Sequence, residues 1–365
     1  MRNLVGLSDM PRQWWDELYS RCCGIIERPG DYAASCRGKV LATLFYEPST
    51  RTNFSFQTAM LKLGGNVFGF SDPMGTSVAK GETLADTIRI TAAYSDAIVI
   101  RSPQEGAAAA AALYSEVPII NAGDGSHFHP TQTLTDLTTI ARKRGGIGNI
   151  RVGLCGDLKH GRTVHSLVEA LSMFSGVSYS LISPESLGMP EYILGSMRSC
   201  GQDFVRMQSL AEAIPDLDVL YMTRIQRERF TNSSDYDALK DSYILTKDML
   251  ARAKPDMLVM HPLPRYREIA PDVDDDPRAV YFEQARFGMF IRMALLHELA
   301  NLPRQTVPLP ESAAGFMCCS PACVTQSEQY LPQLCLDSAI DSMVKRCSYC
   351  DAESSIIDGV WRIQG

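Results

Sequence analysis

Eight short apolar runs alternate with stretches of helical spacing along most of this 365-residue chain. Each run has the length of a buried strand, and strands that alternate with helices predict parallel sheets. Four runs precede the helical stretch 131–144 and the glycine-rich stretch 145–148, and four follow them. We therefore predict an α/β protein with two doubly wound parallel-sheet domains and an active-site cleft between them. The apolar runs are 40–44, 66–70, 97–100, 117–120, 151–154, 177–182, 219–222 and 257–260.

Composition narrows the classes of partner. The net charge of -7 gives no general attraction to nucleic acid or to an anionic membrane, so any anion site must be local. No apolar run reaches the roughly 18 residues of a membrane-spanning helix. The first 20 residues include Asp9, Asp16 and Glu17 and have no signal-peptide pattern. We expect a globular cytoplasmic protein that binds neither nucleic acid nor membrane.

The segment 45–56 joins a predicted strand to a predicted helix through a hydroxyl-rich turn. Pro48 interrupts the chain, and Ser49 or Thr50 can cap the helix that follows. Unpaired N–H groups and the helix dipole favour an anion at such a helix start, and Arg51 adds a bidentate guanidinium group. These residues alone are equally compatible with a phosphate site and with an ordinary capped helix.

Two later strand ends carry further candidate residues. Arg101 directly follows the third apolar run, where its side chain can enter a cleft. The glycine-rich turn 121–133 delivers His129 and Gln132 to a helix start. A histidine can polarise a carbonyl oxygen by donating a hydrogen bond, and a glutamine can pair with an amide. His127 in the same turn has no assigned role.

Several of these motifs resemble those of the transcarbamoylases. Glu-Pro-Ser-Thr-Arg-Thr at 47–52 is similar to the carbamoyl-phosphate loop of that family, and His-Pro-Thr-Gln-Thr at 129–133 to its carbamoyl-binding turn. The resemblance covers roughly residues 1–305. One position departs from it, because Asn53 stands where the family has an arginine. The resemblance implies carbamoyl-phosphate binding by Ser49, Thr50, Arg51, Thr52, Arg101, His129, Gln132, Pro262 and Leu263, with Arg51, Arg101, His129 and Lys80 as catalytic residues.

Arginines after two later strands indicate the second substrate. One arginine follows the segment 156–161, and three more lie within 221–229. Four arginines at strand ends suit a dicarboxylate substrate better than a neutral amine. His-Pro-Leu-Pro-Arg at 261–265 resembles the aspartate-using branch of the family, whereas the ornithine-using branch is expected to carry His-Cys-Leu-Pro. The resemblance implies aspartate binding by Lys80, Arg162, Arg224 and Gln226, and an ion pair of Glu47 with Arg162 or Arg229 when the domains close.

The polar loop 75–82 is too long for a tight turn, and by itself reads as a solvated loop. In the family this loop reaches the active site of a neighbouring subunit, and Ser77 and Lys80 match its serine and lysine. The resemblance therefore implies a homotrimer with shared sites. Pairing of two trimers stays open.

Beyond a proline-containing linker at 303–317, cysteines crowd into the last part of the chain. Two pairs, Cys318-x4-Cys323 and Cys347-x2-Cys350, have the spacing of a four-thiolate zinc site. Cys319 is an alternative to Cys318, Cys335 is spare, and iron is an alternative to zinc. This small segment is similar to the zinc domain of the aspartate transcarbamoylase regulatory chain, without its nucleotide-binding domain. We expect a structural Zn2+ there and no cofactor in the catalytic site.

These observations predict four parts and one reaction. The expected parts are a carbamoyl-phosphate-binding domain at 1–133 completed by a helix near 286–302, an aspartate-binding domain at 134–285, the linker, and a β-rich zinc domain at 318–365. The resemblance implies transfer of the carbamoyl group of carbamoyl phosphate to L-aspartate, giving N-carbamoyl-L-aspartate and phosphate, the committed step of pyrimidine synthesis. A transcarbamoylase for another amine and a catalytically silent binding protein are the alternatives.

Overall fold

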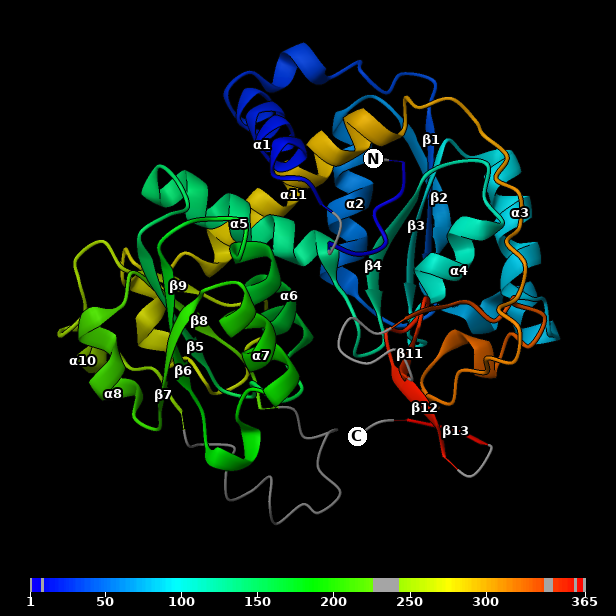
Figure 1. The fold of residues 1–365 in the computed structure, drawn as a ribbon. Helices are drawn as coiled ribbons and strands as arrows, with labels where there is room; N and C mark the ends of the chain where they lie inside the picture. The colour runs from blue at the N-terminus through cyan, green and yellow to red at the C-terminus, as the bar shows by residue number, and fades with distance from the viewer. Residues whose placement is uncertain (1, 8–9, 226–242, 338–343, 358–359, 364–365) are drawn as a thin grey trace. The chain divides into compact units, whose positions relative to one another are not determined.

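The structure is a computed structural model in which two compact units can be described (Figure 1). Unit 1 contains Met1–Gly6, Gln13–Pro130 and Arg292–Gly365, and unit 2 contains Leu7–Arg12 and Thr131–Ile291. The described residues are 2–7, 10–225, 243–337, 344–357 and 360–363.

Unit 1 is built on a parallel sheet of order β2-β1-β3-β4. The chain leaves β1 for β2 on one side and then crosses to β3 on the other, so the topological switch point lies between β1 and β3. The strands are β1 (Val40–Phe45), β2 (Asn66–Phe70), β3 (Ala97–Ser102) and β4 (Ile119–Asp124). The helices include α1 (Arg12–Glu27), α2 (Thr50–Lys62), α3 (Leu84–Tyr94) and α4 (Ala107–Leu113).

Unit 2 has a parallel sheet of order β7-β6-β5-β8-β9, with its switch point between β5 and β8. Its strands are β5 (Ile150–Cys155), β6 (Val177–Ile182), β7 (Asp203–Met207), β8 (Val219–Met222) and β9 (Leu258–Met260). The helices include α5 (Pro130–Arg144), α6 (Arg162–Leu171), α7 (Glu191–Ser199), α8 (Leu210–Ala213) and α10 (Lys247–Leu250), while α11 (Tyr281–Leu299) begins in unit 2 and ends in unit 1.

The predicted fold class is confirmed. The second sheet was expected to have four strands but has five. The strand that was not predicted is β7, which lies at the edge of its sheet. Its residues Asp-Phe-Val-Arg-Met are exposed or half-buried, so they form no apolar run. An exposed edge strand lacks the continuous hydrophobicity that identifies a central parallel strand.

The C-terminal tail forms a small antiparallel sheet of order β10-β11-β12-β13, drawn in red in Figure 1. Among its described residues, Phe316, Val324, Leu331 and Tyr349 join one hydrophobic cluster with residues of α3, α4 and β3. The preceding linker is held by Arg304, whose guanidinium group donates to the carbonyl groups of residues at the end of α3. The strands are β10 (Cys335–Asp337), β11 (Val344–Cys347), β12 (Glu353–Ile357) and β13 (Val360–Ile363).

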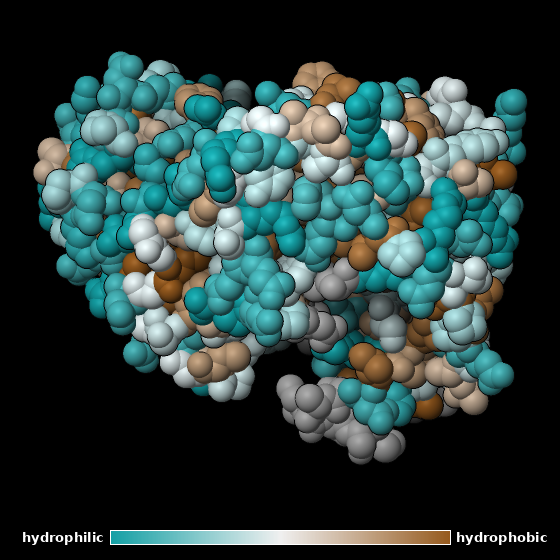
Figure 2. All heavy atoms as spheres, turned by 90° about the horizontal axis from the view of Figure 1, so that it is seen from above, coloured by the Kyte–Doolittle hydropathy of each residue, from teal (hydrophilic) through white to brown (hydrophobic). Residues whose placement is uncertain are grey.

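None of the helices in the described ranges is long and apolar enough to cross a membrane. The face of the molecule in Figure 2 is mostly hydrophilic, with hydrophobic residues scattered over it.

Candidate active site and four-cysteine centre

The ends of β1 and β3 pair with each other at the switch point of unit 1, where Phe45 lies opposite Arg101. The predicted anion-binding residues lie at these strand ends or in the first turn of α2. Ser49 occupies the N-cap position of α2, but its side chain makes no capping hydrogen bond. The 13-residue helix α2 therefore begins without a side-chain cap at the position where a bound anion is favoured. Thr50 and Arg51 are exposed in its first turn, and Thr52 is buried.

Arg101 and Arg51 converge on this helix start. Arg101 is only 7% exposed; its Nη2 donates to Glu47 Oε1 at 2.7 Å and its Nη1 to the Ala122 carbonyl at 3.0 Å. Partial burial, together with the positive charge of Arg101, lowers the pKa of Arg51. Within the described chain the buried Nε of Arg101 has no hydrogen-bond partner. Two arginines that repel each other at a helix N-terminus form a site that an anion would stabilise.

Asn53, which stands where the family has an arginine, has a structural role here. It is 7% exposed, and its Oδ1 accepts a hydrogen bond from Gln57 Nε2 at 2.9 Å, one helical turn later. Its side chain is therefore held within α2.

The turn between β4 and α5 places His129 at the end of a closed loop. Asp124 N donates to the Phe128 carbonyl at 3.2 Å, and Asp124 Oδ1 accepts from Phe128 N at 3.0 Å. His129 itself is buried and immediately precedes α5. The geometry of this turn therefore sets the direction of the His129 side chain.

Gln132 lies on the first turn of α5 and belongs to unit 2. Its Nε2 donates to Asp136 Oδ1 at 2.8 Å. Asp136 is fully buried and also accepts hydrogen bonds from Tyr221 at 2.9 Å and Gln284 at 2.6 Å. Sequence reasoning missed Asp136, although Gln-x-x-x-Asp spacing places both side chains on one helix face.

The predicted aspartate-binding arginines follow the two strands at the switch point of unit 2. Arg162 is the first residue of α6, after β5. Arg224 follows β8 and lines a pocket together with Gly156, Tyr243 and Arg267. Parallel sheets bind ligands at this position, so the pocket is the candidate site for a carboxylate. Gln226 and Arg229, also predicted for this region, lie outside the described residues.

Pro262 and Leu263 follow β9 in a turn held by His261. His261 Nδ1 accepts a hydrogen bond from Leu263 N at 2.7 Å, so its Nε2 donates to Glu268 at 2.8 Å. Burial alone would raise the pKa of Glu268, but hydrogen bonds from His261 and the backbone lower it. Leu263 has a φ of 53°, a left-handed conformation that is uncommon outside glycine.

Ser77 and Lys80 bound a short 3-10 helix in the loop before α3. Both side chains are exposed in the single chain. Thr76 stabilises this turn, since its hydroxyl accepts from Val78 N at 3.2 Å.

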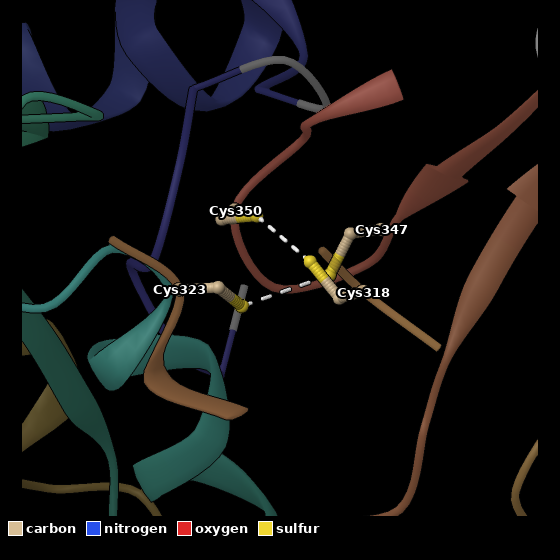
Figure 3. A group of neighbouring side chains, drawn as sticks. All are labelled: Cys318, Cys323, Cys347 and Cys350. Atoms are coloured by element: carbon tan, nitrogen blue, oxygen red, sulfur yellow. Dashed lines mark hydrogen bonds between the residues drawn. The ribbon is translucent and has the colours of Figure 1, made fainter. Parts of the chain in front are cut away.

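Four buried cysteines of the tail gather into one cluster (Figure 3). Their Sγ atoms all lie within 4.8 Å of one another, with Cys318 and Cys350 separated by 3.7 Å and Cys323 and Cys347 by 3.9 Å. Such a group could hold a metal ion. Cys319 points elsewhere, donating to the Trp361 carbonyl at 3.1 Å, so Cys318 rather than Cys319 belongs to the cluster.

Comparison with known proteins gives consistent results. Residues 2–142 match the sequence model of the aspartate/ornithine carbamoyltransferase carbamoyl-P binding domain, and residues 148–299 match the Asp/Orn binding domain. The chain is 55% identical over 301 residues to an aspartate carbamoyltransferase catalytic subunit of Clostridium novyi, covering 82% of this chain and 98% of that relative.

Solved structures agree with this. The catalytic subunit of M. jannaschii aspartate transcarbamoylase is 46% identical with a TM-score of 0.78, covering 82% of this chain and 98% of that one. The Trypanosoma cruzi aspartate transcarbamoylase, in complex with N-(phosphonacetyl)-L-aspartic acid, is 38% identical with a TM-score of 0.77, covering 82% and 95%. The second of these domain matches ends at residue 299, before the tail.

Proposed function

This chain belongs to the aspartate and ornithine carbamoyltransferase family, and from that premise we propose that it transfers a carbamoyl group from carbamoyl phosphate to L-aspartate. The observation that carries the proposal is the pair of arginines at the start of α2. Arg51 lies in the first turn of α2, after β1, and Arg101 lies near the end of the neighbouring strand β3. Partial burial and the charge of Arg101 lower the pKa of Arg51. The phosphate of carbamoyl phosphate would satisfy both.

The reaction needs no covalent enzyme intermediate. The neutral amine of aspartate forms a bond to the carbonyl carbon, and negative charge develops on the carbonyl oxygen. The bond from that carbon to the phosphate oxygen then breaks, and the phosphate leaves with the electron pair and takes up the amine proton. Arg51, Arg101 and His129 stabilise this charge, and Gln132 orients the carbamoyl amide.

The choice of aspartate over ornithine rests on the second site. Arg162 and Arg224 follow the strands at the switch point of unit 2, where two carboxylates would be bound. Ornithine has one carboxylate and a cationic side chain, which these arginines would repel. The similar proteins from Clostridium novyi and M. jannaschii are also aspartate enzymes by name.

We further infer a homotrimer in which Ser77 and Lys80 complete the site of a neighbouring subunit. Their exposure on a polar loop supports this, because neither has a local role. Mixing inactive Arg51→Ala subunits with inactive Lys80→Ala subunits should restore part of the activity, because some sites then carry both residues intact. No recovery in mixed trimers would count against shared sites.

The four-cysteine cluster is assigned to a structural Zn2+. A tetrahedron of sulfur atoms about 2.3 Å from zinc has edges of about 3.8 Å, close to the 3.7 and 3.9 Å separations of the two sulfur pairs. Zinc bound there would link the two ends of the tail and stabilise its fold.

One assay tests the proposed function. Wild-type protein should form N-carbamoyl-L-aspartate and should not turn over ornithine. Arg51→Ala should lower kcat/KM by about 100-fold to 1,000-fold, since it removes a donor to the transition state. Lys62→Ala, at the other end of α2, is the matched control. Turnover of ornithine, or full activity of Arg51→Ala, would contradict the proposal.

A further inference from the structure

His127 takes no part in the proposed chemistry, yet both of its ring nitrogens face carboxylates. Nδ1 lies 3.1 Å from Asp124 Oδ2, and Nε2 lies 2.9 Å from Asp351 Oδ2. Carboxylates only accept, so the ring donates on both sides. Burial alone would lower the pKa of His127, but these two hydrogen bonds raise it to about 10, so the ring is cationic at neutral pH. The result is a charged bridge between two segments 224 residues apart in the chain.

Asp124 connects this bridge to two of the active-site loops of unit 1, those after β3 and β4. Its buried carboxylate accepts from Gly106 N at 2.8 Å, in the loop after β3, and from Phe128 N at 3.0 Å, in the loop after β4. The first loop follows Arg101, and the second ends at His129. A displacement of Asp124 would therefore disturb the loops next to Arg101 and His129, two of the candidate carbamoyl-phosphate residues.

Asp351 connects the bridge to the four-cysteine centre. It directly follows Cys350 and has a φ of 57°, a conformation imposed by the turn that begins at Cys347. Its N–H donates to the Cys347 carbonyl at 3.0 Å, which closes that turn. The position of the Asp351 carboxylate thus depends on the geometry of the cysteine pair.

A second set of contacts holds the loop after β3 against the same centre. Glu105 N donates to the Ala322 carbonyl, and Val324 N donates to the Glu105 carbonyl, both at 2.9 Å. These two tail residues flank Cys323, one of the four clustered cysteines. Each of the two cysteine turns therefore supports one active-site loop.

On the basis of the function inferred above, we propose that His127 is a positioning residue that ties the turn bearing His129 to the four-cysteine centre through Asp351. Closure of the cysteine turn fixes the position of Asp351, and Asp351 orients the His127 ring. The ring in turn holds Asp124 and the 124–129 turn in place. Carbamoyl-phosphate binding by this chain depends on its own tail by this route. The exposed side chain of Asp351, 40% accessible, makes the link open to mutation without creating a buried cavity.

Two variants test the link. His127→Ala and Asp351→Ala should each weaken carbamoyl-phosphate binding, measured by calorimetry, by about 10-fold, as do losses of groups that orient ligand-binding side chains. The KM for aspartate at saturating carbamoyl phosphate should stay within twofold of the wild-type value. Asp351→Asn keeps an acceptor for Nε2 and should recover part of the affinity. Asp337→Ala removes an exposed tail carboxylate that pairs with Lys345 and should bind like wild type.

The metal content of every variant, measured by mass spectrometry, must equal that of the wild type. Arg51→Ala serves as the reference variant, because the proposed function requires it to bind carbamoyl phosphate weakly. If metal-loaded Asp351→Ala and His127→Ala bind carbamoyl phosphate as tightly as wild type while Arg51→Ala does not, the inference is overturned and the function stands. If His127→Ala loses its metal, Asp351→Ala alone decides. If Arg51→Ala also binds normally, the proposed function fails first.

Discussion

The backbone of Tyr349 lies against Gly106 so closely that a Cβ added to Gly106 would come within 2.5 Å of the Tyr349 Cβ and 2.6 Å of its carbonyl carbon. Gly106 also has a φ of 81°, which side chains rarely adopt. The tail and the start of α4 are therefore in contact through main chain, with no room for a side chain between them.

We predict that Gly106→Ala destabilises the protein by at least about 2 kcal/mol, because it combines a strained φ with a steric clash. Thermal or urea unfolding measures the change. Gly195→Ala is the matched control, since Gly195 lies within α7 with open space around it and should be neutral or slightly stabilising. Equal behaviour of both variants would show that the tail does not contact α4.

Cys318→Ser and Cys319→Ser should differ sharply although the residues are adjacent. Cys318 belongs to the four-sulfur cluster, whereas Cys319 donates to the Trp361 carbonyl. The first variant should lose bound metal and the second should keep one ion per chain. Elemental analysis after dialysis makes the comparison, and metal loss from Cys319→Ser would reverse the assignment.

Removal of the metal from the wild-type protein should expose apolar surface on α3 and α4 as well as on the tail. Phe316 and Tyr349 share a cluster with α3 and α4, so an unfolded tail uncovers that cluster. A chelator should increase binding of a hydrophobic dye and lower the melting temperature. Addition of Zn2+ should reverse both changes, and a chelator without effect on melting would contradict the prediction.

Asp136 should be more sensitive to change than its partner Tyr221. Tyr221→Phe removes one hydrogen bond to a buried carboxylate and should cost about 1–2 kcal/mol. Asp136→Ala leaves Gln132, Tyr221 and Gln284 without this acceptor and should cost at least about 3 kcal/mol. Urea unfolding ranks the two, and the reverse order would show that Asp136 does not organise these groups.

Glu268 should make unit 2 sensitive to acid. Its pKa lies below the ordinary 4.5, so its contribution to stability is complete above that pH and is lost as the pH falls through the lower, folded-state value. Glu268→Gln should lower stability at neutral pH and reduce the loss on acidification. Unfolding at neutral pH and near about pH 4 measures this. Glu283→Gln, in an exposed ion pair, is the control and should change little.

Most of the strands, the start of α2 and the cysteine cluster were predicted, because each depends on residues that are close together in the sequence. The continuous apolar runs predicted the buried strands, and the cysteine spacing predicted the cluster. The helix after Pro48 was expected from its turn residues and forms α2. By contrast, β7 was missed because an exposed edge strand needs no apolar run.

Side chains that act through distant partners could not be predicted in this way. His127 was left without a role, since its partner Asp351 lies 224 residues away and pairing over that distance leaves no local pattern. Asp136 was missed because its donors Tyr221 and Gln284 come from later elements. The roles of Ser77 and Lys80 stay predictions, because they concern a second subunit.

The core that the tail shares with α3, α4 and β3 has a consequence for synthesis on the ribosome. Unit 2 has been translated completely by Ile291, whereas the apolar face of α4 waits for Tyr349 near the end of the chain. Helix α4 ends at Leu113, and at about 5 to 20 residues per second the chain from there to Tyr349 takes roughly 10 to 50 seconds to synthesise. The first sheet to emerge is thus the last to be completed, and a message truncated before the tail would release a chain with this surface uncovered.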